Sequence, residues 1–176
     1  MNSFGIIVDA GTVEFKRVMP GPIERVWAFI TERNNLARWL GDGVLGPAGT
    51  RYELKIEGPE LPLSTGARIV GEVTRYEPPT GITFTWNHFA PGTTQPTITE
   101  SIVEIDLASQ NEKVVLTLRH SHIDRSFTTR LSTGWHAFLD ALRNRLDGNP
   151  IEFATTVFPQ LLPEYERRFS EVGRTN

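Results

Sequence analysis

The sequence feature that most restricts the fold is a change in the spacing of apolar residues between residues 121 and 131. In five earlier runs apolar and polar residues alternate, which is the period of β-strands. Pieces rich in Gly, Pro, Ser or Asn separate these runs and are typical of turns. After residue 131 the apolar residues follow helical spacing, so an antiparallel meander is expected to precede a long helix. The five predicted strands are residues 51–57, 67–77, 81–87, 97–107 and 113–121.

The part of the chain before these runs predicts one strand and two short helices. Residues 12–19 alternate, which predicts a strand. In residues 22–32 the apolar side chains lie at i, i+3, i+4 and i+7, the stripe of an amphipathic helix, and Pro22 suits its first turn. A second short helix is expected to present Leu36, Trp39 and Leu40 and to end at the glycines that follow.

The predicted long helix begins at Leu131 and ends before Gly148 and Pro150, residues that commonly terminate helices. A helix of about 15 residues is roughly 22 Å long, which is enough to lie across a small sheet. Its expected apolar face comprises Leu131, Trp135, Phe138, Leu139, Leu142 and Leu146.

The tail after residue 149 is interrupted by Pro159 and Pro163. Its last part has apolar residues at helical spacing, from Tyr165 through Phe169, which predicts a short terminal helix packed on the body. The same tail could instead pack on a second copy of the chain, and the sequence leaves this homodimer open as the alternative. The residues available for such an interface are Phe153, Val157, Phe158 and Tyr165.

These elements predict an α+β fold of the helix-grip kind: a curved antiparallel sheet of about six strands wrapped around the long C-terminal helix. Two short helices follow the first strand, and a cavity can remain between the sheet and the long helix. No repeat or linker divides the chain. We therefore expect a single domain over residues 1–176, with a core of about 13–147 and a C-terminal extension of about 149–176.

Composition excludes several classes of function. The net charge of -3 and the pI of about 5.8 disfavour a broad electrostatic contact with nucleic acid. The chain has no cysteine, so disulfides, thiolate metal sites and a cysteine nucleophile are absent. It has no run of about 18 apolar residues, which predicts no membrane span. Its first residues lack a basic region, so we expect no signal peptide and a cytoplasmic protein.

Four motifs resemble those of the START-like (helix-grip, SRPBCC) superfamily, and within it the family of the activator of heat-shock protein 90 ATPase. The resemblance extends over about residues 13–147. It implies the fold and a pocket between sheet and helix, while members of the superfamily include hydrophobic-ligand carriers, polyketide cyclases and a co-chaperone domain. The motifs are PIERVWAFITE with LARWL, GEVTRYEPPTGITFTW, LTLRHS and GWHAFLDALRNRL.

The alternation along the predicted strands places several aromatic and imidazole side chains on one face of the sheet. In the implied fold this face looks toward the long helix, so its members either fill the core or line a pocket. Phe84 is expected in the core, and Trp86 at the wall. The predicted pocket residues are Trp39, Phe84, Trp86, His88, Leu118, His120, Trp135, Phe138 and Leu142.

The histidines raise two chemical alternatives. His120 and His122 lie on one side of a strand, and His88, His136 or Asp124 could complete a metal site, but nothing in their spacing requires one, so we expect no metal and no cofactor. An acid/base role for His120 or His88, with a carboxylate such as those at 72, 100 or 104, also remains open. No serine lies in a nucleophile elbow.

Three functions follow from these observations. The first is a binding protein whose partner is a small apolar molecule. The second is an enzyme of the polyketide cyclase or hydrolase type that uses the same pocket. The third is a domain that interacts with a chaperone ATPase, as the name of the resembled family suggests, although fold alone does not determine function.

Overall fold

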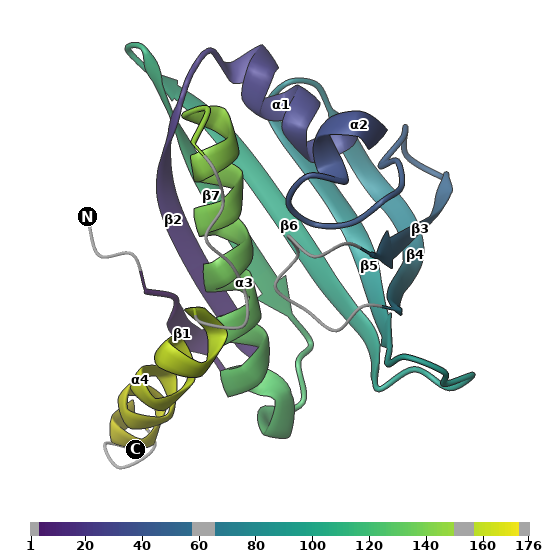
Figure 1. Ribbon diagram of the computed structural model, residues 1–176, viewed down its shortest axis with the longest axis vertical. Coiled ribbons are helices and arrows are strands. Elements are labelled where there is room, and N and C mark those ends of the chain that lie inside the picture. The colour runs from purple at the N-terminus through teal and green to yellow at the C-terminus, as the bar shows by residue number, and fades with distance from the viewer. Residues whose placement is uncertain (1–3, 58–65, 150–156, 173–176) are drawn as a thin grey trace.

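The computed structural model describes residues 4–57, 66–149 and 157–172 (Figure 1). Within these ranges seven strands form one antiparallel sheet in the order β1-β2-β7-β6-β5-β4-β3. The sheet curves around α3, and α1 and α2 cover one end of its concave face. The strands are β1 (Ile6–Asp9), β2 (Thr12–Pro20), β3 (Arg51–Ile56), β4 (Ala67–Glu77), β5 (Gly81–Phe89), β6 (Ile98–Gln110) and β7 (Lys113–Ser121).

The meander predicted from residues 51–121 is confirmed, because β3 to β7 are consecutive neighbours in the sheet. The strand at 12–19 is also confirmed as β2. It pairs with β7, from Val13 opposite His120 to Pro20 opposite Lys113, so segments about one hundred residues apart lie side by side. This long-range pairing places the first long strand beside the last one and extends the sheet around the helix.

The prediction of about six strands was one short, because β1 was not expected. This strand has four residues, and Ile6 and Val8 on it are exposed, so no alternation of buried and exposed positions marks it. It forms by pairing with β2 across a tight turn. In that turn Gly11 has a φ of 78°, a conformation that glycine adopts without strain.

The two short helices lie where they were expected, with one shift. The first, α1 (Ile23–Thr31), buries the predicted apolar stripe. The second, α2 (Arg33–Leu36), begins earlier than predicted, since only Glu32, in an extended conformation, separates it from α1. It is also shorter than predicted, because it ends at Leu36. Trp39 and Leu40 are buried as expected, but they follow the helix in turns.

The long helix α3 (Arg125–Leu146) has 22 residues and begins six residues before the predicted start. The Asp124 side chain accepts a hydrogen bond from the Ser126 backbone N–H at 2.8 Å and caps the N-terminus. The first turns carry mostly Ser, Thr and Arg side chains, and their one apolar residue, Phe127, lies four residues before the predicted start at Leu131. At about 1.5 Å per residue, α3 is about 33 Å long.

The terminal helix α4 (Val157–Val172) is longer than predicted, because the two prolines do not end it. Pro159 lies in the first turn, where no backbone N–H is needed for helix bonds, and Pro163 lies within the helix. Tyr165 is fully buried within its own chain, whereas Val157 and Phe158 are half-buried. Phe153, the remaining residue of the expected dimer surface, lies outside the described residues, and the homodimer stays a prediction.

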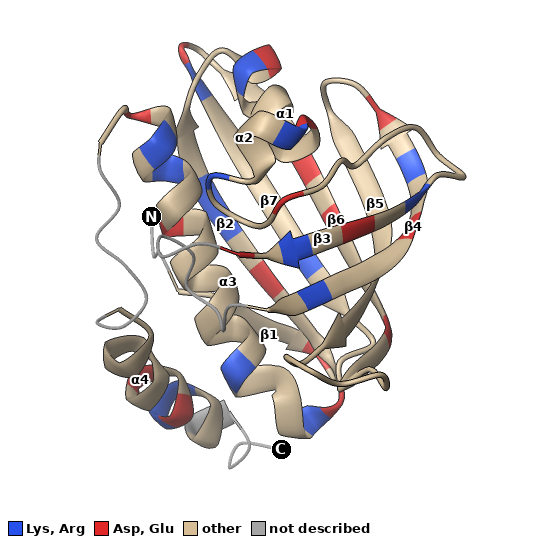
Figure 2. Ribbon diagram, turned by 45° about the vertical axis from the view of Figure 1, so that its right-hand side comes forward, with Lys and Arg blue, Asp and Glu red and all other residues tan. Residues whose placement is uncertain are grey.

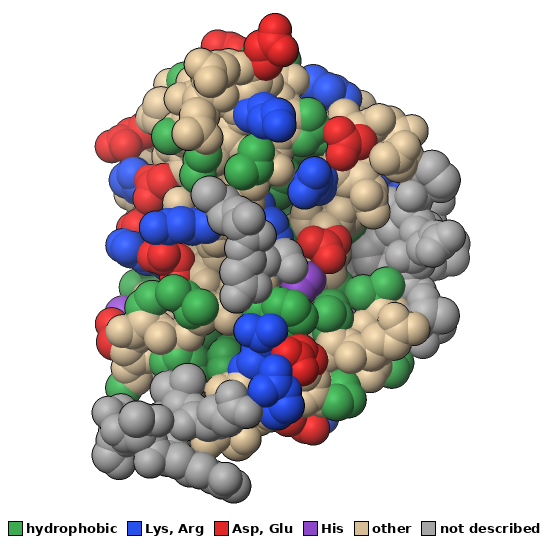
Figure 3. All heavy atoms as spheres, turned by 90° about the vertical axis from the view of Figure 1, so that its left-hand side faces the viewer, with side chains coloured by type: hydrophobic (Ala, Val, Ile, Leu, Met, Phe, Trp, Pro, Cys, Tyr) green, Lys and Arg blue, Asp and Glu red, His purple; other side chains and the backbone are tan. Residues whose placement is uncertain are grey.

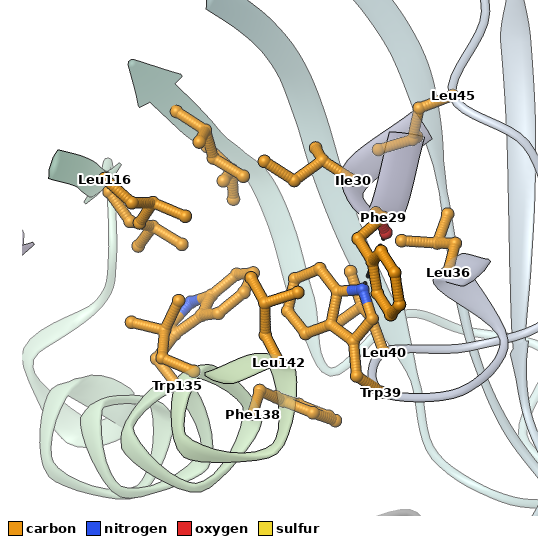
Figure 4. Close-up of a cluster of buried hydrophobic side chains, with 14 of the residues drawn as sticks. Phe29, Ile30, Leu36, Trp39, Leu40, Leu45, Leu116, Trp135, Phe138 and Leu142 are labelled. Atoms are coloured by element: carbon orange, nitrogen blue, oxygen red, sulfur yellow. Dashed lines mark hydrogen bonds between the residues drawn. The ribbon is translucent and has the colours of Figure 1, made fainter. Parts of the chain in front are cut away.

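The core lies between the concave face of the sheet, α3, and the α1–α2 segment. Figure 4 shows Trp39 between Phe138 and Leu142 of α3 on one side and Phe29 of α1 on the other. The Trp39 indole Nε1 donates a hydrogen bond to the Phe29 carbonyl at 2.8 Å, so this large side chain is buried with its polar atom satisfied.

The surface carries charges of both signs. Figure 2 shows basic and acidic residues interspersed along the strands, and Figure 3 shows the same mixture on one face, with hydrophobic side chains gathered in its lower half. A mixed surface of this kind offers no broad basic field for nucleic acid on that face. In the described parts of the chain, no helix is long and apolar enough to cross a membrane.

A polar cluster holds α4 and the N-terminal segment against the outer side of α3. The Gly5 backbone N–H donates to the Tyr165 hydroxyl at 2.9 Å, and this hydroxyl lies 2.9 Å from His136 Nδ1. Because the hydroxyl accepts from Gly5, its own proton is free to be donated to His136. His136 Nε2 in turn lies 3.3 Å from Asp140, which is also 3.7 Å from the buried guanidinium of Arg17.

We predict that Tyr165→Phe lowers the free energy of unfolding by about 1–3 kcal/mol, because two buried polar groups lose their partner. Urea denaturation measures this change. The matched control is Tyr76→Phe, since the Tyr76 hydroxyl makes no hydrogen bond with a described residue. Equal losses in the two variants would show that the cluster does not hold α4.

Candidate functional site

A cavity of about 580 Å³ lies between the sheet and the N-terminal half of α3. This volume is within the range of small-molecule sites, about 300–1,000 Å³. Most of the lining is apolar or aromatic. Its described residues are Trp86, His88, Ala90, Thr97, Ile98, Phe127, Arg130, Leu131, Gly134, Trp135, Phe138, Phe158 and Pro159.

Four segments form the walls of the cavity. The end of β5 contributes Trp86 and His88, and the start of β6 with the loop before it contributes Ile98 and Thr97. The first turn of α4 adds Phe158 and Pro159. The α3 residues lie at i, i+3, i+4, i+7, i+8 and i+11, which is one face of a helix. They are Phe127, Arg130, Leu131, Gly134, Trp135 and Phe138.

Four of the nine pocket residues predicted from the sequence line this cavity: Trp86, His88, Trp135 and Phe138. The other five are not among its lining residues and are fully buried in the core or beneath the cavity wall. Phe84, for which the core was expected, is one of them. The five are Trp39, Phe84, Leu118, His120 and Leu142.

Sequence reasoning missed the α3 wall that precedes Trp135, together with the β5–β6 loop and α4. The helical spacing of Phe127, Leu131, Trp135 and Phe138 was visible in the sequence. The predicted helix begins only at Leu131, so Phe127 and Arg130 fell outside it. Nothing comparable marks Ala90 or the first turn of α4, since these reach the cavity only through the tertiary fold.

His120 lies in a chain of hydrogen bonds that connects α3 to three strands. The Trp135 indole Nε1 donates to His120 Nδ1 at 2.9 Å, so Nδ1 carries no proton. In the neutral imidazole the proton is then on Nε2, which lies 2.9 Å from Ser101 Oγ and donates to it. Ser101 Oγ donates to the Trp86 carbonyl at 2.8 Å. The order of donors is therefore determined at every step.

This arrangement makes His120 a structural group. Its side chain is fully buried, and burial lowers its pKa to about 3. Both ring nitrogens are engaged, so neither is available to move a substrate proton. The adjoining Trp86 ring is 5.1 Å from the Trp135 ring, and its Nε1 is buried without a hydrogen-bond partner among the described residues.

His88 differs, because it lines the cavity and keeps one nitrogen free. The Thr97 hydroxyl donates to the His88 carbonyl at 3.1 Å, so at 2.7 Å it accepts from His88 Nδ1–H. Nε2 then carries a lone pair, and no described residue donates to it. Burial lowers the pKa of His88, which favours the neutral ring. His88 can therefore accept a hydrogen bond from a ligand.

The histidines do not form a metal site in the described part of the chain, where no group of three or more His, Asp or Glu side chains comes together. The strand β7 ends at Ser121, and His122 has a φ of 57° and is exposed, whereas His120 is buried. The two imidazoles that alternation placed on one side of a strand therefore point into different environments.

A curved antiparallel sheet that grips a long helix, with a cavity between them, defines the helix-grip or START-like class of proteins. The sequence profile of one family, described as "Activator of Hsp90 ATPase homolog 1-like protein", matches residues 20–147. The chain belongs to this family, as its motifs suggested. No curated protein matches the chain significantly.

Solved structures share this fold. The solution structure of a Bordetella parapertussis protein is 29% identical, with a TM-score of 0.72, and the match covers 95% of this chain and 91% of that one. CalU16 from Micromonospora echinospora is 20% identical with a TM-score of 0.67, over 89% and 86% of the two chains. DynU16, from the dynemicin biosynthetic locus, is 23% identical with a TM-score of 0.66, over 83% of this chain and 51% of its own.

We predict that His120 makes stability depend on pH. An unfolded histidine has a pKa of about 6.5, and the folded value is about 3, so below pH 6.5 the unfolded chain binds a proton that the folded protein does not. The contribution of His120 is therefore complete above that pH and is lost as the pH falls. The slope approaches about 1.4 kcal/mol per pH unit.

The variant His120→Gln tests this dependence, because its amide can accept from Trp135 and donate to Ser101 without titrating. Urea unfolding between about pH 7 and pH 5 should give a shallower slope for the variant than for the wild type. His88 contributes equally to the slope of both proteins, and carboxyl groups titrate mainly below this pH window, so the difference between the slopes reports on His120. Identical slopes would contradict the buried neutral state of His120.

Proposed function

We propose that the protein binds a small, mainly apolar organic molecule in the cavity between the sheet and α3. The observation that carries this proposal is a cavity of about 580 Å³ whose walls are aromatic and which the described side chains leave open. Aromatic rings that face a void lose dispersion contacts, and water gains few hydrogen bonds there. A ligand that fills the space restores the dispersion contacts of the rings and displaces water that has few hydrogen-bond partners.

The apolar walls supply most of the binding free energy in this proposal. Each 100 Å² of apolar ligand surface removed from water contributes about 2.5 kcal/mol before the costs of association. Trp86, Trp135 and Phe138 are almost fully buried, so they are held in place before the ligand arrives. Rigid aromatic walls of this kind lose little entropy on binding.

The geometry supports binding without a catalytic step. His120 is neutral and has both nitrogens engaged, which leaves His88 as the imidazole at the cavity. No Asp or Glu is among the described lining residues, so no carboxylate there could share a proton with His88. The polar groups of the lining are suited to orienting a ligand.

A variant that fills the cavity tests the proposal. We predict that Ala90→Trp weakens binding of N-phenylnaphthylamine, a neutral aromatic probe that fluoresces in apolar sites, by at least about tenfold, or 1.4 kcal/mol. Ala90 lies in a loop and lines the cavity, so added bulk there occupies space that the probe needs. Fluorescence titration measures the affinity.

The matched control is Thr94→Trp, which adds the same ring at an exposed position of the same loop that is not part of the lining. It should leave the affinity unchanged. Equal binding by both variants would mean that the probe lies elsewhere, and the proposal would be wrong. In addition, native mass spectrometry of the freshly purified protein would detect any molecule that copurifies and would measure its mass.

A further inference from the structure

We infer that the ligand of this cavity is an organic monoanion: a carboxylic acid with an apolar, preferably aromatic, body. This inference rests on the proposed function, because it assigns a ligand class to the same cavity. It depends on Arg130, on the neutral state of His88, and on the order in which charged and apolar residues follow one another along α3.

Among the described lining residues Arg130 alone carries a charge, and none is acidic. The chain as a whole has a net charge of -3, so this local positive charge is opposite in sign to the protein's average. A cavity with one cation and no carboxylate favours an anionic ligand over a neutral or cationic one of the same shape.

Arg130 also differs from three other arginines, which pair with carboxylates of the described chain. Arg33, Arg75 and Arg119 each lie 2.7 Å from a carboxylate oxygen. Arg130 is exposed, and it makes no hydrogen bond or ion pair with a described residue. Its guanidinium can therefore bind an incoming carboxylate through two parallel hydrogen bonds without first leaving another partner.

The charge lies toward the N-terminal end of the α3 wall, where only Phe127 of the lining precedes it. Along α3, Trp135 and Phe138 follow Arg130 by five and eight residues, which is about 7.5 and 12 Å along the helix axis. Figure 2 shows the basic residues of α3 toward its two ends. Arg130 is exposed, whereas Trp135 and Phe138 are only 1% and 2% exposed. The wall thus matches a molecule with an anionic head near water and an apolar body inside.

A single negative charge fits better than two. One guanidinium balances one carboxylate, and the described lining offers no second cation for a phosphate dianion. His88 does not supply one, because burial favours its neutral form. Its free Nε2 is a hydrogen-bond acceptor, which repels a second anionic oxygen but accepts a hydroxyl or N–H group carried by the apolar body.

The experiment compares pyrenebutyrate with its primary amide, pyrenebutyramide, which has the same apolar body and no charge. Fluorescence anisotropy measures the affinity of each probe for the wild type, Arg130→Gln and Arg125→Gln. Arg125 is the matched control, since it is an exposed arginine of α3 that makes no ion pair with a described residue and does not line the cavity.

We expect the wild type to bind the acid about fivefold more tightly than the amide, as for one solvent-accessible ion pair. Arg130→Gln should remove this preference and leave the affinity for the amide unchanged, whereas Arg125→Gln should keep it. Raising the salt concentration should weaken binding of the acid but not of the amide.

The outcomes separate this inference from the proposed function. Equal affinities of the wild type for acid and amide, or a preference that survives in Arg130→Gln, would overturn the monoanion while leaving the apolar cavity as a binding site. Binding of neither probe to the wild type would contradict both. A loss of affinity for the amide in Arg130→Gln would show that the arginine acts through packing, not charge.

Discussion

The hydrogen bond from the Trp135 indole to His120 ties α3 to the sheet beside the cavity. It is buried, and it continues through Ser101 to the Trp86 carbonyl, so a single chain of donors joins the helix to β7, β6 and β5. Removing any one of these side chains leaves a buried polar group without a partner. The resulting loss of folding free energy exceeds the contribution of an average hydrogen bond. The same bonds hold Trp135 and Trp86 as the inner wall of the cavity.

The two halves of α3 have different roles because the concave face is covered unevenly. Toward its C-terminal half, α1 and the turns after α2 bring Phe29 and Trp39 against Phe138 and Leu142, and the space is filled (Figures 1 and 4). Toward its N-terminal half no such pair of helices covers the sheet within the described residues, and the first turn of α4 lines the cavity there. The cavity lies where the described helices α1 and α2 do not cover the sheet, and the proposed binding site follows from that difference.

Much of the fold could be predicted, because burial on one face imposes a period on the sequence. The meander, the strand at 12–19, the buried stripe of α1 and the family were all correct. The predictions failed where burial marks few positions: β1 is an exposed edge strand, and the first turns of α3 carry a single apolar residue, Phe127, among polar ones. For the cavity, alternation identified Trp86 and His88, but it could not separate wall from core.

The sequence by itself determined the class of fold, the concave face of the strands and the apolar face of the long helix, since each depends on spacing within one segment. Only the tertiary structure decided which of those residues enclose an open space. Trp86 and Phe84 belong to the same face of β5, yet one lines the cavity and the other is core, because different segments lie opposite them. Likewise, the pairing of both His120 nitrogens depends on residues from α3 and β6, which no local pattern brings together.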